Sequence, residues 1–263
     1  MHQHMAKVIH PDRDSLGEPA ALYKQARFPV ALTGAGISVE SGIPDFRSDN
    51  GLWQIFRPDE YATIEAFTRT PEKAWRLYRA LGAALFGKKP SPAHAALKQL
   101  ETADHLRAII TQNIDGLHSL AGSQKVLEVH GEHQHLHCLE CGFIRPFQVE
   151  DLEEGPPPVC RQCGYPLKPN IVLFGEMVRK MNEIDELLSK CDLLLVIGTS
   201  AQVYPVASFP YIVHDQGGLI YEFNTTTTPL THTADFFFEG KAGTTVPALA
   251  QAVLGESTRS IRG

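Results

Sequence analysis

The 263-residue sequence has no long hydrophobic run and no recognisable leader. Its longest strongly apolar stretch, LLLVIG at 193–198, is far shorter than the roughly 20 residues that a bilayer crossing needs. The first residues, MHQHMAKVIHPDRD, lack the apolar core of a secretory signal. We therefore expect a soluble cytoplasmic protein that does not bind a membrane.

Basic character is also scarce, and blocks of like charge are missing. The chain carries 24 Lys and Arg against 30 Asp and Glu, a formal net charge of −6. This balance disfavours unspecific binding to nucleic acid. Hydrophobic residues make up 43% and charged residues 21% of the chain, which is a globular composition. The length fits one large domain, or a core domain with a smaller one.

Short apolar runs alternate with helix-like stretches along the chain. Residues 91–103 and 178–191 place apolar side chains at the i, i+3, i+4 spacing of a helix. The apolar runs contain few polar residues, as in parallel strands that are covered on both faces. We therefore predict an α/β fold with a doubly wound parallel sheet. The expected strands cover 28–33, 107–112, 125–129, 170–174, 192–199, 218–223 and 235–239.

Two segments interrupt this alternation and predict a small second domain. Residues 50–90 read as a helical, aromatic insertion, and residues 131–169 hold both C-x-x-C pairs and a proline run. We expect these two insertions to pack together. The remaining segments, 1–49, 91–130 and 170–263, are expected to form the sheet domain.

Four of the five cysteines have the spacing of a zinc site. Cys138 and Cys141 form one C-x-x-C pair, and Cys160 and Cys163 form the second after eighteen intervening residues. This spacing is typical of a tetrahedral four-thiolate zinc centre, and a reducing compartment disfavours two disulfides. Four thiolates leave no open position, so the zinc is expected to be structural. Cys191 is expected to be a small buried hydrophobe.

Three histidines precede the first cysteine pair. His133, His135 and His137 alternate as on a strand. Because four thiolates already complete the zinc coordination, we interpret the histidines as a solvated strand face.

A glycine-containing turn follows the first expected strand. Gly34 and Gly36 permit close approach of a pyrophosphate, and the main-chain N–H groups of the next turn supply donors. Alone, this pattern is weak evidence, because Val39 stands where a dinucleotide fingerprint has its third glycine. No acid ends a second strand about twenty residues on, which argues against an ordinary dehydrogenase.

Six blocks of sequence, taken together, resemble the sirtuins, the NAD-dependent protein-lysine deacylases. The resemblance runs from about residue 20 to 253. It implies a Rossmann-like domain with an inserted zinc-carrying small domain, NAD consumed as co-substrate, and one structural Zn²⁺. The blocks are GAGISVESGIPDFRSDNGLW, TQNIDGLHSLAG, VLEVHGEHQHLHC, KPNIVLFGE, VIGTSAQVYPVA and GKAGTTVPAL.

The resemblance also assigns roles to residues. His130 would be the general base, since an imidazole suits removal of a ribose proton near neutral pH, and Asn113 would assist in catalysis. His118 is a rival histidine at a position that is usually structural in sirtuins. NAD would be held by Gly34, Ala35, Gly36, Ser38, Asp45, Phe46, Arg47, Trp53, Gln112, Asn113, Ile114, Asp115, Gly198, Thr199, Ser200, Asn224, Thr225 and Ala242.

For the substrate, the resemblance implies an acyl-lysine peptide bound as an added strand between residues 172–176 and 201–206. Desuccinylases of the family carry Tyr-x-x-Arg in the helical insertion, but here Leu81 follows Tyr78 at that spacing. Arg76 and Arg79 lie on other helix faces. We therefore expect acetyl or longer neutral acyl groups, and a deacetylase above all. The expected substrate contacts are Tyr78, Val172, Phe174, Gly175, Glu176, Val203 and Tyr204.

Other functions are weighed against deacylation. A protein mono-ADP-ribosyltransferase would share the cleavage of NAD, and a deacylase for longer or acidic acyl groups would differ only in its pocket. A zinc-ribbon binding module leaves the glycine loop and TQNID unexplained, and the acidic charge counts against nucleic acid. A hydride-transferring dehydrogenase lacks its ribose-binding acid.

Overall fold

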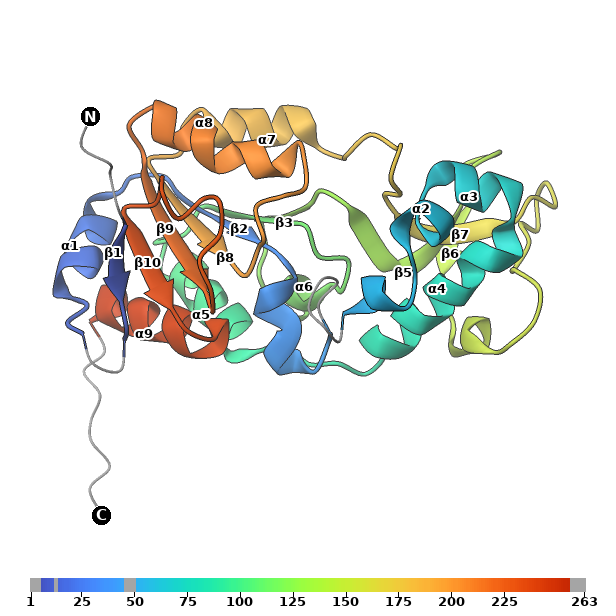
Figure 1. Cartoon of the computed structure of the whole chain (residues 1–263), viewed down its shortest axis with the longest axis horizontal. Helices are drawn as coiled ribbons and strands as arrows, with labels where there is room; N and C mark the ends of the chain where they lie inside the picture. The colour runs from blue at the N-terminus through green and yellow to red at the C-terminus, as the bar shows by residue number, and fades with distance from the viewer. Residues whose placement is uncertain (1–5, 12–13, 45–50, 256–263) are drawn as a thin grey trace, which may run out of the picture.

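The computed structural model describes residues 6–11, 14–44 and 51–255. Asp45, Phe46 and Arg47 of the expected cofactor loop lie outside the described residues. The molecule is elongated, with a large sheet domain at one end and a small mixed domain at the other (Figure 1). Among the described helices, none combines the length and the apolar composition that a bilayer crossing requires.

A seven-stranded sheet forms the large domain, and every neighbouring pair in it is parallel. The predicted parallel sheet is therefore confirmed. β1 was not predicted, because a three-residue edge strand is too short to give a pattern. In spatial order the strands are β1 (Lys7–Ile9), β10 (Phe236–Glu239), β9 (Leu219–Asn224), β8 (Leu193–Ile197), β2 (Pro29–Thr33), β3 (Ala108–Thr111) and β4 (Val126–Glu128).

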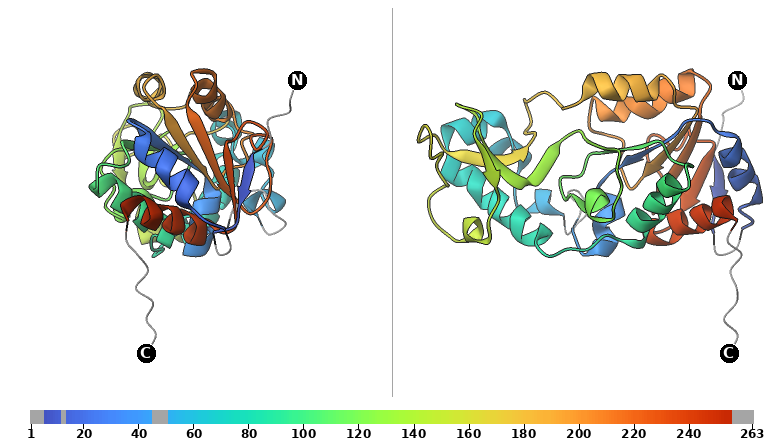
Figure 2. Two further views of the ribbon diagram at one scale, coloured as in Figure 1. Left: turned by 90° about the vertical axis from the view of Figure 1, so that its left-hand side faces the viewer. Right: turned by 180° about the vertical axis from the view of Figure 1, so that it is seen from behind.

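Helices cover both faces of this sheet, as Figure 2 shows. On one face α1 (Gly17–Gln25), α5 (Pro92–Thr102) and α9 (Ala242–Leu254) enclose a core that includes Leu195 and Phe238. On the other, α7 (Met181–Leu188) and α8 (Phe209–Asp215) pack over side chains such as Leu194 and Val196. Successive residues of a strand point to opposite faces, so a strand covered on both sides must be apolar throughout. This requirement explains the continuous apolar runs.

The small domain joins helices to a three-stranded antiparallel sheet with the order β6, β5, β7. Its core surrounds Trp75, whose indole N–H donates to the carbonyl oxygen of Leu167 at 2.7 Å. The helical elements are η2 (Leu52–Gln54), α2 (Pro58–Tyr61), α3 (Ile64–Arg69), α4 (Pro71–Leu85) and η3 (Val149–Leu152). The strands are β5 (Gly131–Cys138), β6 (Ile144–Pro146) and β7 (Leu167–Ile171).

Two expectations about this domain are wrong. The strand expected over 170–174 in the parallel sheet is β7, which ends at Ile171 and pairs antiparallel with β5. The apolar residues beyond it line a cavity, which is why they gave the same signal as a buried strand. His133 does not lie on a solvated face, because it is only 5% exposed and packs against Phe147.

The chain runs outward from β2 in both directions across the sheet. β3 and β4 lie on one side of β2, and β8, β9 and β10 lie on the other. In such sheets, ligands bind outside the carboxyl ends of the strands where the order reverses. The short helices η1 (Ala35–Ser41), α6 (Leu117–Leu120) and η4 (Val206–Ser208) complete the described elements. The first of them directly follows β2 at this switch point.

Candidate active site

A cavity of about 940 Å³ opens at the carboxyl ends of β2, β3, β8 and β9 and extends to the small domain. Among the described residues predicted for catalysis, NAD or substrate, Ser38, Asp115 and Tyr78 do not line it. The structure brings the others together. Those that line it are Gly34, Ala35, Gly36, Trp53, Gln112, Asn113, Ile114, His130, Val172, Phe174, Gly175, Glu176, Gly198, Thr199, Ser200, Val203, Tyr204, Asn224, Thr225 and Ala242.

The glycines of the first loop are required by a close approach of two main chains. The N–H of Gly36 donates to the carbonyl oxygen of Gly198 at 2.8 Å. A Cβ at Gly36 would lie 2.6 Å from the Cα of Gly198. The loop after β2 is therefore packed directly on the loop after β8. Val39, at the position of the missing third glycine, is 48% exposed, so there is room for its side chain.

Three polar side chains beneath this loop form one hydrogen-bonded group. The amide of Asn113 donates to the carbonyl oxygen of Gly34 at 3.1 Å and to Ser38 Oγ at 3.2 Å. Ser38 Oγ in turn donates to Asp115 Oδ2 at 2.6 Å. Since Asn113 and Ser38 are buried, their bonds are made in a low dielectric and hold the loop firmly. Ser38 and Asp115 thus support the cavity from behind.

Thr199, in the loop after β8, holds two more lining residues in place. Gln112 donates from its side-chain amide to Thr199 Oγ1 at 3.0 Å, and Asn224 donates to the Thr199 carbonyl oxygen at 3.0 Å. The buried carboxylate of Glu222 accepts hydrogen bonds from Thr228 and Thr231 and fixes the loop after β9. Burial raises the pKa of Glu222 above its ordinary value.

His130 lines the cavity in the connection from β4 of the large sheet to β5 of the small domain. Its Nδ1 is 3.0 Å from the main-chain oxygen of Gln112. Since a carbonyl oxygen only accepts, Nδ1 carries the hydrogen and Nε2 keeps a lone pair. Burial lowers the pKa of His130 below 6.5, partly offset by this hydrogen bond. A neutral imidazole with a free acceptor nitrogen is the form that a general base needs.

His118 has different surroundings. It does not line the cavity, and its Nε2 is 2.9 Å from Thr33 Oγ1. Its ring centroid lies 4.6 Å from that of His94. Burial, together with a smaller contribution from His94, lowers the pKa of His118 to about 3. His118 is therefore a neutral core residue.

The small-domain end of the cavity is apolar. Leu77 and Leu81, one turn apart on α4, line it together with Ile171 and Leu173. Leu77, Ile171 and Leu173 were not predicted, and Leu81 was named only as the residue in place of an arginine. The i, i+4 spacing of the two leucines marks a shared face. Also not predicted were lining residues from η1, from the loop after β9 and from the start of α9, namely Val39, Glu40, Thr226, Thr227, Thr228 and Lys241.

Tyr78, in contrast to the leucines beside it, is buried in the small-domain core. It is fully covered, and its hydroxyl has no hydrogen-bond partner among the described residues. Burial raises the pKa of Tyr78 above its ordinary value. Arg79 points away from the cavity, since its guanidinium lies 5.2 Å from the Trp75 ring centroid and donates to the carbonyl oxygen of Gly155 at 3.0 Å.

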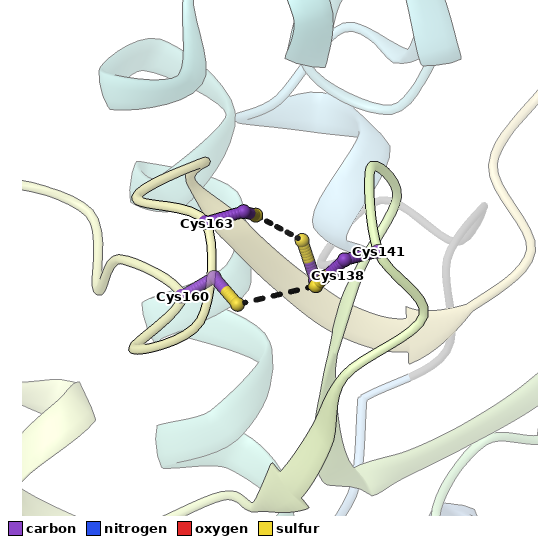
Figure 3. A group of neighbouring side chains, drawn as sticks. All are labelled: Cys138, Cys141, Cys160 and Cys163. Atoms are coloured by element: carbon purple, nitrogen blue, oxygen red, sulfur yellow. Dashed lines mark hydrogen bonds between the residues drawn. The ribbon is translucent and has the colours of Figure 1, made fainter.

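The four cysteines of the two C-x-x-C pairs converge from two turns of the small domain, as Figure 3 shows. Their sulfur atoms all lie within 4.8 Å of one another. The distances from Cys138 to Cys163 and from Cys141 to Cys160 are both 3.5 Å, too long for a disulfide at about 2.05 Å. They are close to the roughly 3.8 Å between thiolates on a tetrahedral zinc ion. The cluster is therefore compatible with a structural Zn²⁺.

The doubly wound sheet, the cavity at its switch point and the cysteine cluster define a nucleotide-binding α/β protein with an inserted metal-ribbon domain. Residues 34–205 match the Sir2 family. The chain belongs to this family, which confirms the predicted membership and fold class.

Its relatives include proteins of known structure. A protein of Thermococcus kodakarensis named NAD-dependent protein deacylase is 43% identical, with 90% of this chain and 95% of that protein covered. A Sir2 homologue solved as an NAD complex is 39% identical, with a TM-score of 0.87 and coverage of 97% and 98%. Sir2Af2, solved with a myristoylated histone peptide, is 36% identical, with a TM-score of 0.76 and coverage of 90% and 95%.

Proposed function

We propose that this chain is an NAD-dependent protein-lysine deacylase, and above all a deacetylase. It would consume NAD and release nicotinamide, O-acyl-ADP-ribose and free lysine. The observation that carries the proposal is the position of His130, which lines the cavity together with the residues proposed to hold NAD and with the apolar residues of the small domain. The names of the relatives point the same way.

NAD would lie across the switch point. Gly34, Ala35 and Gly36 would lie against the phosphates, with the N–H group of Ala35 at the start of η1 as the donor, as helix N-termini do for anions. Gln112, Asn113, Ile114 and Asp115 would lie by the nicotinamide and its ribose. Gly198, Thr199, Ser200, Asn224, Thr225 and Ala242 would hold the adenosine. In the cofactor loop, Phe46 would cover the reacting sugar carbon and Arg47 would contact phosphate, with Asp45 and Trp53 also contacting NAD.

The chemistry would take place in two stages. First, the amide oxygen of the acyl-lysine attacks the ribose carbon, the bond from that carbon to nicotinamide breaks, and an imidate forms. Second, His130 Nε2 takes the proton of a neighbouring ribose hydroxyl, whose oxygen attacks the imidate carbon. Lysine then leaves as the free amine, and water supplies the oxygen that completes the O-acyl ester. Asn113 would help to orient the ribose through the group it forms with Ser38.

The acyl-lysine peptide would bind as an added strand between 172–176 and 201–206. One edge of the first segment is already paired, because Phe174 donates to Ala62 and accepts from Ile64. The other edge would take the peptide, opposite Val203 and Tyr204. Phe174 and Tyr204 are 45% and 74% exposed, as expected for side chains that a ligand covers. Val172, Gly175 and Glu176 complete the contacts.

The acyl group would be neutral. Leu77 and Leu81 line the inner end of the cavity, whereas Arg76 is exposed and Arg79 is engaged elsewhere. Lys241 is the one lysine or arginine among the described lining residues, and it adjoins α9 on the nucleotide side. A succinyl carboxylate would therefore enter an apolar end without a cation, at a cost of several kcal/mol. Tyr78 would support this end from behind.

The remaining predictions complete the proposal. The segments 50–90 and 131–169 would form the small domain, with 1–49, 91–130 and 170–263 as the NAD-binding domain. The zinc would be structural, since four thiolates close its coordination sphere. Cytoplasmic location stays a prediction from the sequence.

The experiment is mass spectrometry of acetyl-, myristoyl- and succinyl-lysine peptides after incubation with and without NAD. We expect NAD-dependent loss of acetyl or myristoyl groups, slow loss of succinyl, and no turnover by His130→Ala. ADP-ribosylated protein in place of O-acyl-ADP-ribose would support the transferase alternative instead. A fully active His130→Ala variant would remove His130 from the mechanism.

A further inference from the structure

We infer that Glu132, Asn170 and Arg179 form a brace that holds the main chain around His130 in its reactive position. The inference rests on the proposed function. The three residues come from β5, from β7 and from the segment before α7. Since they are not part of the cavity lining, they are positioning residues and do not contact the substrate.

The side chains form a continuous hydrogen-bonded row. Arg179 donates from its guanidinium to Asn170 Oδ1 at 2.7 Å, and Asn170 donates from Nδ2 to Glu132 Oε1 at 2.7 Å. The side-chain amide of Asn170 therefore accepts from the cation of Arg179 and donates to the anion of Glu132. Hydrogen bonds to charged groups are shorter and about twice as strong as neutral ones. The row ties the first residues of β5 to the chain that leaves the small domain.

The same crossing chain holds the main chain on either side of His130. The N–H of Arg179 donates to the carbonyl oxygen of Val129 at 3.0 Å. The N–H of Val172 donates to the carbonyl oxygen of His130 itself at 2.7 Å. Val172 lines the cavity, so the segment that would receive the peptide also anchors the proposed base.

The brace packs on the chain directly after His130. Gly131 has φ +74°, and a Cβ there would lie 2.2 Å from the carbonyl oxygen of Asn170 and 3.0 Å from Arg179 Cζ. Only glycine fits this contact. The brace thereby sets where the chain turns from β4 into β5.

His130 depends on this support because it lies in the short connection between two strands. β4 ends at Glu128 and β5 begins at Gly131, each in a different sheet. The hydrogen bond from Nδ1 to Gln112 orients the imidazole only while the main chain stays in place. A displacement of about 1 Å can reduce a reaction rate about 10²-fold. Loss of the brace should therefore slow the proton-transfer stage.

The two chemical stages give a selective test. Exchange of labelled nicotinamide into NAD, with an acetyl-lysine peptide present, reports the first stage and does not need the base. Formation of O-acetyl-ADP-ribose reports the second. In the full chain with zinc, we expect Arg179→Ala to raise the ratio of exchange to product formation about tenfold. Arg179→Lys, which keeps a donor for Asn170, should restore most of product formation.

The matched control is Arg69→Ala, which removes an exposed arginine that pairs with Glu65 on α3. It should leave the ratio unchanged. Glu132→Ala removes the far end of the row and should raise the ratio about threefold, so it decides the question if Arg179→Ala does not fold. An unchanged ratio in the folded variants, or parallel loss of both rates, would overturn the brace. Wild-type protein without NAD-dependent nicotinamide release would instead contradict the proposed function.

Discussion

The Nδ1 atom of His130 and the main-chain oxygen of Gln112 lie 3.0 Å apart. This contact fixes the tautomer of the imidazole, and the side chain of the same glutamine reaches Thr199 at 3.0 Å. One residue at the end of β3 thus connects the proposed base with the loop after β8. Gln112 therefore affects both the tautomer of His130 and the position of Thr199, which is proposed to bind NAD.

The pH dependence of turnover should reflect the burial of His130. Burial lowers its pKa below 6.5, and a general base is active when deprotonated. Activity should therefore be retained at pH 6.5 and be lost only as the pH falls through the lowered pKa. The measurement is kcat/KM for an acetyl-lysine peptide between pH 5 and 9. An acid limb with its midpoint at about pH 7 or above would contradict this assignment.

Ser38→Ala should weaken NAD binding. The substitution removes the donor to Asp115 Oδ2 and an anchor of the loop after β2. We expect the Kd for NAD to rise about tenfold, which corresponds to about 1.4 kcal/mol. Titration calorimetry measures this, with Ser189→Ala at the exposed end of α7 as the control. Equal affinity in Ser38→Ala and the control would show that the buried group does not support the cofactor loop.

Leu81→Arg should shift the acyl preference toward acids. Leu81 lines the apolar end of the cavity, and a guanidinium there would pair with a succinyl carboxylate. We expect the ratio of succinyl to acetyl turnover to rise at least about tenfold over wild type. Leu85→Arg, one turn further along α4 and outside the lining, serves as the control. A wild-type enzyme that already prefers succinyl peptides would rule out the neutral pocket.

Cys141→Ser should release the metal and destabilise the small domain. Cys138 and Cys160 belong to the same buried cluster as Trp75, so loss of the ion would loosen that core. Metal analysis should find one zinc ion per wild-type chain. The melting temperature should fall by more than about 10 °C on chelation or in the variant. Cys191→Ser should keep its zinc, and retention of a full ion by Cys141→Ser would contradict the assigned ligand set.

Stability should decrease in acid because of two buried histidines. Burial lowers the pKa of His118 to about 3 and that of His94 to about 4. The unfolded chain takes up protons below pH 6.5, whereas the folded chain does so only near these lower values. The stabilisation is therefore complete above pH 6.5 and declines as the pH falls toward 4 and 3.

Urea unfolding at pH 7 and pH 5 tests this decline. His118 alone should contribute a loss of up to about 2 kcal/mol between these pH values. His118→Asn, which does not titrate in this range, should show a smaller loss than wild type. If wild type and variant lose the same free energy, His118 is not held neutral by the fold.

The sequence predicted the large sheet well because burial on both faces makes its strands apolar throughout. Leu193–Ile197 and Pro29–Thr33 are completely buried. The same signal gave a wrong strand over 170–174, because the apolar Leu173 lines the cavity and does not belong to the sheet. β1 was missed because three residues on an edge strand carry no distinctive pattern.

The site could be predicted only in part for a similar reason. Motifs mark residues that are proposed to meet a ligand, such as Gly34, but the apolar end of a pocket resembles any other core. Leu77 and Tyr78 are neighbours in the sequence, yet only Leu77 lines the cavity, because successive helical residues point in different directions. Long-range contacts such as that of Arg179 with Asn170 leave no local signal at all.

The most direct test of the account is a product balance with an acetyl-lysine peptide and NAD. Nicotinamide, free lysine peptide and O-acetyl-ADP-ribose should accumulate in equal amounts, and no peptide should be deacetylated without NAD. Free acetate formed while NAD remains intact, or tight binding of NAD without any nicotinamide release, would contradict the proposed reaction.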